Sequence, residues 1–118
     1  MTTLQFLDPA TLDEFLTAPV AVLMLAKTDC DACAQWTEEL ETYLSSDGFD
    51  PAFGDVRFGK LILNQPRLGA FKKANPWLAE VDVLPTNVIF RGGQADKRWA
   101  GGGLDRLLNR LRRGASPG

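Results

Sequence analysis

The sequence predicts an α/β domain whose central mixed sheet has about five strands, with helices on both faces. Three observations predict it. Strand-like apolar runs alternate with helix-like segments through the first 74 residues, an order that is typical of parallel β-α-β units. Two strand-like segments near the C-terminus are joined by a Gly-Gly turn, which indicates an antiparallel hairpin. Finally, 118 residues of which 45% are hydrophobic suffice for one core but not for two.

The first elements lead up to a buried central strand. A short strand is expected over residues 4–7, and a helix over 11–18 places three apolar side chains on one face. These are Leu12, Phe15 and Leu16. Pro19 then ends the helix. Residues 20–26 are all apolar, which favours a strand that is covered on both faces.

A second helix is expected from residue 32 to residue 44 or 45, because apolar side chains recur there at steps of three and four. They are Cys33, Trp36, Leu40, Tyr43 and Leu44. The stretch 45–48, Ser-Ser-Asp-Gly, ends this helix, and a loop is expected over 49–54.

The remaining elements complete the sheet. We expect strands over 56–63, 87–90 and 95–100, a turn over 91–94, and helices over 67–74 and 104–112. Pro76 can open a further turn through Trp77 and Leu78. We expect a single domain over 1–113 and a flexible tail over 114–118.

The two cysteines of the chain, Cys30 and Cys33, stand where the central strand meets the second helix. A C-x-x-C at such a junction indicates dithiol/disulfide chemistry. Cys30 lies just ahead of the helix, where free N–H groups and the helix dipole stabilise a thiolate, so we assign it as the nucleophile. Cys33, one turn inside and more buried, is the expected resolving thiol. The alternative is a pair of ordinary helix-end cysteines.

Four charged residues near Cys30 are expected to modulate its pKa. Asp29 and Asp31 oppose the thiolate and should raise the pKa of the Cys30 thiol. Lys27 and Lys60 offset them if their side chains point inward; the alternative is that both lysines are solvated at strand edges.

Composition excludes several function classes. The chain has no histidine, which removes Ser-His and Cys-His catalytic pairs and any histidine-containing metal site. Two cysteines cannot close a four-ligand zinc site in one chain, although a cluster bridged across a dimer is conceivable. We expect no cofactor other than a redox-active Cys30–Cys33 disulfide.

The expected surroundings are cytoplasmic. The net charge of −2 gives no basic field for nucleic acid, and the longest apolar run is far too short to span a bilayer. The first residues lack the basic region and apolar core of a signal peptide, which favours a cytoplasmic protein. In a reducing compartment a C-x-x-C is catalytic, redox-sensing or metal-binding more often than structural.

With this order of elements and C-x-x-C after the second strand, the sequence resembles the thioredoxin superfamily over nearly its whole length. Four further segments carry the resemblance. They are Lys60 to Pro66, Val81 with Leu84-Pro85-Thr86, Phe90 to Gly93, and Gly101. The resemblance implies a thioredoxin-like fold in which Pro85 follows a cis peptide bond and faces the cysteines. It also implies that the backbone of Leu84 pairs with a bound peptide, so Leu84, Pro85 and Thr86 are the expected substrate-binding residues.

The sequence departs from the thioredoxin pattern around the cysteines. Asp31-Ala32 replaces Gly-Pro between them, and Asp29 stands where the family has tryptophan. Met24 occupies the position of the family's buried aspartate, and Glu38 that of the proline that kinks the helix. The segment between Pro66 and Pro85 is also longer than in thioredoxins.

The predicted function is a thioredoxin-like thiol–disulfide oxidoreductase that reduces protein disulfides and serves cell redox homeostasis. Its partners would be disulfide-containing proteins and a reductase or thiol electron donor, with no nucleic acid and no membrane. One alternative is a non-catalytic binding or redox-sensing module that uses the groove around Leu84-Pro85. The other is a glutathione-linked enzyme that resembles glutaredoxins, through Lys27-Thr28-Asp29-Cys30 and Gly102-Gly103-Leu104-Asp105. Leu-Pro-Thr and the longer hairpin argue against the second alternative.

Overall fold

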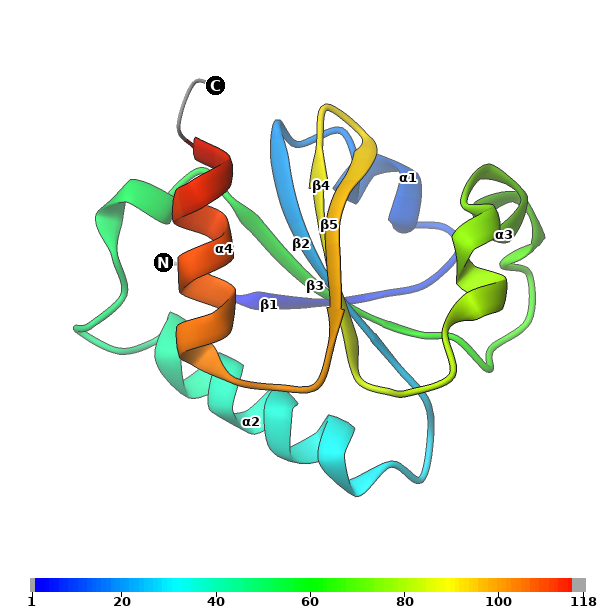
Figure 1. Cartoon of the computed structure of the whole chain (residues 1–118), viewed down its shortest axis with the longest axis horizontal. Helices are drawn as coiled ribbons and strands as arrows, with labels where there is room; N and C mark the ends of the chain where they lie inside the picture. The colour runs from blue at the N-terminus through cyan, green and yellow to red at the C-terminus, as the bar shows by residue number, and fades with distance from the viewer. Residues whose placement is uncertain (1, 116–118) are drawn as a thin grey trace.

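A computed structural model describes residues 2–115, which form a five-stranded sheet between two layers of helices (Figure 1). The strands are β1 (Leu4–Leu7), β2 (Val20–Ala26), β3 (Arg57–Ile62), β4 (Thr86–Arg91) and β5 (Gln94–Ala100). The helices are α1 (Leu12–Phe15), α2 (Asp31–Leu44), α3 (Gly69–Ala74) and α4 (Leu104–Ala115). Two short 3₁₀ helices, η1 (Pro51–Phe53) and η2 (Pro76–Glu80), lie in the connections.

The strands lie in the order β1-β3-β2-β4-β5, which places β2 in the centre. β3 pairs in parallel with both β1 and β2, whereas β4 is antiparallel to β2 and to β5. The mixed sheet predicted from the sequence is therefore confirmed. The β4–β5 turn has positive φ at both Gly92 (59°) and Gly93 (80°), a conformation that glycine adopts without steric cost.

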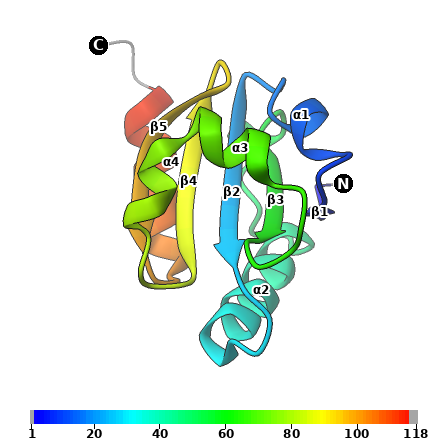
Figure 2. The same ribbon diagram turned by 90° about the vertical axis from the view of Figure 1, so that its right-hand side faces the viewer.

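Side chains of successive residues in β2 alternate between two hydrophobic cores. Val22 and Met24 belong to the core under α2 and α4, while Leu23 and Leu25 belong to the core under α1 and α3. Figure 1 shows the two helix pairs on opposite sides of the sheet, and Figure 2 shows α3 lying across it. Burial on both faces explains why the sequence of β2 is apolar without interruption.

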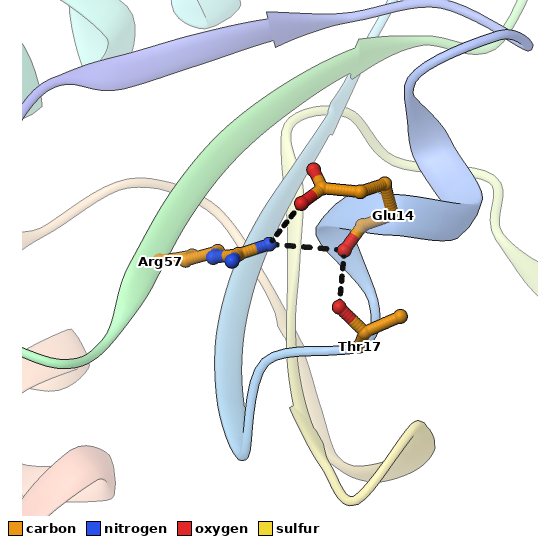
Figure 3. A network of polar contacts seen from close by, with 3 residues as sticks. All are labelled: Glu14, Thr17 and Arg57. Carbon is orange, nitrogen blue, oxygen red and sulfur yellow. Dashed lines mark hydrogen bonds and ion pairs between the residues drawn. The ribbon is translucent and has the colours of Figure 1, made fainter.

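The predicted helix over 11–18 is wrong in length, since α1 ends at Phe15. The backbone N–H groups of Thr17 and Ala18 donate to carbonyls three residues back, which tightens and ends the last turn. The Glu14 carbonyl also accepts the Thr17 hydroxyl (2.6 Å) and the Arg57 guanidinium (2.9 Å), as Figure 3 shows. The accompanying Arg57–Glu14 ion pair (3.3 Å) is exposed and contributes little to stability.

Other boundaries also shift for local reasons. α2 begins at Asp31 because Cys30 caps it, one residue earlier than predicted. α3 begins at Gly69, because Arg67 has a φ of +69° that a helix cannot contain. The predicted loop over 49–54 contains η1, whose first turn is capped by the Asp50 carboxylate on the Ala52 N–H (2.9 Å).

The predicted tail over 114–118 overlaps α4, which continues through residue 115. The rest of that prediction lies outside the described residues. Among the helices of residues 2–115, none has the length and apolar character required to cross a membrane.

Candidate dithiol site

Cys30 and Cys33 form a disulfide at the N-terminal end of α2. Cys30 is the N-cap residue, with extended backbone angles (φ −123°, ψ 104°), so its side chain stands ahead of the first helical turn. Its Cα lies 5.2 Å from the Cα of Cys33. Cys33 is 1% exposed, whereas Cys30 is only partly buried. A partner can therefore approach Cys30 and not Cys33.

The start of α2 supplies positive potential at the Cys30 sulfur. The backbone N–H of Cys33 donates to Cys30 Sγ at 3.2 Å. Unsatisfied N–H groups and the helix dipole favour negative charge at this position. In the reduced protein this arrangement stabilises the Cys30 thiolate, which is the nucleophilic form of the residue.

The loop before β4 lies against the same sulfur. The carbonyl oxygen of Leu84 is 3.9 Å from Cys30 Sγ, and the Leu84–Pro85 peptide bond is cis. A disulfide sulfur carries no proton, so in this state the Leu84 contact is one of packing. Once Cys30 is a thiol, its S–H can donate a weak hydrogen bond to the same carbonyl.

The three predicted substrate-binding residues are placed differently from one another. Leu84 is half-buried beside Cys30, and Pro85 is buried behind it. Thr86 is 5% exposed and its hydroxyl donates to the Val83 carbonyl (2.6 Å), so its side chain is occupied within the loop. The exposed apolar side chain of this loop is Val83 (53%), which we had not singled out from the sequence.

The predicted pKa modulators lie at or near the surface. Lys27, Asp29 and Asp31 are exposed, and none of them forms an ion pair with another described residue. Lys60 is half-buried, and its ammonium lies 5.5 Å from the centre of the Phe6 ring on the edge strand β1. The two acids therefore flank Cys30, while Lys60 is engaged with an aromatic ring.

A pair of hydrogen bonds that the sequence did not predict holds the loop before Cys30. The Thr28 N–H donates to Asn64 Oδ1 (3.2 Å), and Asn64 Nδ2 donates to the Thr28 hydroxyl (2.8 Å). The next residue, Asp29, has a φ of +56°, an unusual conformation for a residue other than glycine. The two Thr28–Asn64 hydrogen bonds therefore hold the backbone immediately before Asp29.

One hydroxyl lies between the Cys33 backbone and a buried thioether. Met24 is completely buried, and Thr37 donates its hydroxyl to the Cys33 carbonyl at 2.7 Å. The same hydroxyl lies 3.5 Å from Met24 Sδ, but its single proton serves the shorter bond. A thioether therefore occupies the position where the thioredoxin pattern has a carboxylate. The sequence feature that could have identified Thr37 is its position one helical turn after Cys33, from which a threonine hydroxyl can reach the Cys33 carbonyl.

Asn87 is a second buried polar residue that sequence reasoning missed. It is 1% exposed, accepts the Trp36 indole N–H at 2.8 Å and donates to the Gly101 carbonyl at 2.8 Å. It thus joins α2 to the chain that follows β5. The sequence feature that could have identified Asn87 is an amide side chain within an apolar strand. A buried amide needs hydrogen-bond partners, so such a residue indicates a polar contact in the core.

Metal binding finds no support in the described part of the chain. Residues 2–115 contain no cluster of three or more histidine, cysteine or acidic side chains arranged to hold a metal ion.

Comparison with protein-family models and with curated proteins finds no match. Solved structures do match. Thioredoxin f2 of Chlamydomonas reinhardtii superposes with a TM-score of 0.71 at 23% identity, covering 98% of this chain and 99% of that one. A thioredoxin of Malassezia sympodialis gives 0.72 at 18% identity, with 98% and 94% covered. Thioredoxin f of spinach chloroplast gives 0.68 at 21% identity, with 97% and 88% covered. The chain therefore has the thioredoxin fold, as the sequence predicted.

Proposed function

We propose that this protein is a thiol–disulfide oxidoreductase that reduces protein disulfides through Cys30 and Cys33. The observation that carries the proposal is the Cys30–Cys33 disulfide at the head of α2, with the Leu84 carbonyl 3.9 Å from the more exposed sulfur. Thioredoxin-fold neighbours that cover nearly the whole chain support a redox role of this kind.

The reaction begins with the reduced protein. The Cys30 thiolate attacks one sulfur of the substrate disulfide, forming a mixed disulfide while the substrate S–S bond breaks. The released substrate thiolate takes a proton. Cys33 then loses its proton, and its thiolate attacks Cys30 Sγ. The mixed disulfide breaks, and the second substrate thiolate leaves and is protonated. Two electrons have passed to the substrate, and the protein ends as the Cys30–Cys33 disulfide.

The surroundings of the two cysteines suit them to different roles in this reaction. Cys30 combines exposure with the N–H of Cys33 at 3.2 Å, which suits a nucleophile. Cys33 is buried one turn away, where it can reach the Cys30 sulfur but no external disulfide. Leu84 would offer its backbone to the substrate chain, beside Pro85.

The proposal includes the partners and the place of the reaction. The substrates are disulfide-containing proteins, and a thiol or dithiol donor, such as a reductase, returns the two electrons. We place the reaction in the cytoplasm, where reducing conditions keep a C-x-x-C pair available as a dithiol.

Reduction of insulin by dithiothreitol tests the activity. The wild-type protein is expected to accelerate the reaction, and Cys30→Ser to abolish the acceleration. Cys33→Ser should instead accumulate a mixed disulfide between Cys30 and substrate, visible by mass spectrometry as the summed mass. An equal rate in wild type and Cys30→Ser would rule the proposal out.

The second candidate is a non-catalytic binding or redox-sensing module, and one observation favours it. Met24 is completely buried where the thioredoxin pattern has a carboxylate, and its thioether is not a base that can accept the Cys33 proton. In that case insulin reduction stays at the background rate with every thiol donor. Turnover with glutathione as the sole donor would instead favour the glutaredoxin-like alternative, with Lys27 exposed beside the motif.

A further inference from the structure

A surface groove of about 520 Å³ runs along α2 on the side that faces the first turn of α4. Its floor is formed by Tyr43 and Leu104, and its α2 wall includes Gln35, Glu38 and Thr42. Figure 1 shows the start of α4 beside α2. The groove lies outside the dithiol site, since neither cysteine lines it.

The α2 wall has a helical period. Gln35, Glu38 and Thr42 follow one another at steps of three and four, so they form one stripe. Asp31, four residues before Gln35, continues this stripe towards Cys30 but does not line the groove. Groove residues on this helix extend from Gln35 to Tyr43, which corresponds to about 12 Å at the rise of an α-helix, and Ser46 lies just beyond the helix end. That length accommodates about two turns of a second helix.

The groove is acidic and its charge is not neutralised within the described structure. α2 carries four acidic residues and no lysine or arginine. Glu38 and Glu39 both line the groove, and neither forms an ion pair with another residue of the range 2–115. An apolar floor beside unpaired carboxylates favours an occupant with apolar and cationic side chains on adjacent faces.

Two arginines of α4 are engaged elsewhere and do not fill this role. The Arg110 guanidinium lies 4.7 Å from the centre of the Trp99 ring, and Arg112 pairs with Asp50 at 3.9 Å. The α4 of a second copy is also unsuitable, because its apolar residues Leu107 (0% exposed) and Leu111 (2%) are buried in their own core. These contacts favour an occupant from another protein.

We propose that the α2 groove docks a basic amphipathic helix of a partner protein. The partner's leucine-like side chains contact Tyr43 and Leu104, and its lysines or arginines face Glu38 and Glu39. Docking requires no thiol chemistry, so it stands independently of the proposed reductase activity.

The probe is a synthetic 12-residue peptide of leucine and lysine, designed as an amphipathic helix. A scrambled peptide of the same composition serves as its control. Binding is measured by calorimetry and mapped by amide chemical shifts of the full-length, isotope-labelled protein. We expect saturable binding of the helical peptide, weaker binding of the scrambled one, and shifts centred on Gln35, Glu38, Thr42 and Leu104.

Two variants of one helix supply the matched comparison. Glu38→Lys places a cation in the groove, whereas Glu41→Lys makes the same charge change on a side of α2 that does not line it. Glu38→Lys is expected to raise the dissociation constant about 2- to 30-fold more than Glu41→Lys. Circular dichroism checks that both variants are folded, and Cys30→Ser should bind like the wild type.

Three binding results would overturn the proposal. They are absence of saturable binding, equal binding of the scrambled peptide, and equal weakening by the two lysine variants, which would indicate general electrostatic attraction. Sedimentation that reveals a dimer dissociated by Glu38→Lys would assign the groove to a second copy and would also overturn it.

Discussion

Asp29 offers the sharpest test of how the unusual sequence around Cys30 affects its reactivity. Its carboxylate is exposed, adjoins the nucleophile and forms no ion pair with any residue between 2 and 115. Asp29→Asn removes the charge while retaining the shape and the tolerance of asparagine for a φ of +56°. The change therefore isolates the electrostatic contribution.

The magnitude follows from distance and solvent exposure. Side-chain groups of adjacent residues are separated by about 7 Å, roughly twice the Cα spacing. Two charges at about 7 Å interact by about 0.6 kcal/mol in water, which corresponds to about 0.4 of a pKa unit. Removing a negative charge stabilises the thiolate, so the pKa of Cys30 should fall by about this amount in Asp29→Asn.

At a pH below the pKa of Cys30, Asp29→Asn should also speed alkylation of the Cys30 thiol. The rate should rise by a smaller factor than the thiolate fraction. A decrease of about 0.4 unit increases the thiolate fraction about 2.5-fold, but a less basic thiolate is also less nucleophilic. The net gain is about 1.6-fold. It should shrink at high salt, because both groups are accessible to ions.

The assay is ultraviolet titration of the thiolate in a Cys33→Ser background, where Cys30 is the only thiol. Asp55→Asn is the matched control, since Asp55 is exposed and precedes β3 at the opposite end of the sheet. An unchanged or higher pKa in Asp29→Asn, or an equal shift in the control, would refute the electrostatic reasoning. A pKa of about 6 or lower in the Cys33→Ser parent would refute the expectation that the acids raise it.

Three further predictions concern stability and are checked by urea unfolding. Asn87→Ala should lower the free energy of unfolding by about 2–4 kcal/mol, because it leaves the buried Trp36 N–H without an acceptor. Gly59→Ala should cost about 1–3 kcal/mol, because the new Cβ would lie 2.8 Å from the Phe15 ring. Met24→Asp should destabilise more as pH rises, because burial raises the pKa of the new carboxyl. Its penalty is smallest below about pH 4 and grows at higher pH, where the unfolded chain ionises the carboxyl while the folded protein keeps it protonated.

The parts of the fold predicted well are those whose signals are local. β2 was predicted to the residue, because its apolar run is bounded by Pro19 and Lys27. The hairpin followed from Gly92-Gly93, which few other residues can replace at positive φ. The first helix was predicted too long because its end depends on the tightened turn at Thr17, which apolar periodicity does not reveal.

The site divides in the same way. The C-x-x-C pair lies within four residues, so the sequence reveals it directly. The surrounding contacts join residues far apart in the chain: Thr28 and Asn64 are 36 positions apart, and Cys30 and Leu84 are 54. Only the sheet topology brings these segments together, and neither Asn64 nor Asn87 lies in a periodic pattern that marks it as a partner.

The net charge of the chain is small, but two of its helices carry charges of opposite sign. α2 has four acidic residues and no basic ones, whereas α4 has four arginines and one acidic residue. The structure places the helices side by side over one core, with Arg110 on Trp99 and Arg112 on Asp50. Adjacent helices of opposite charge would be expected to pair. Because Arg110 and Arg112 face other residues, they do not pair with the acids beside the groove, which stay accessible to a partner.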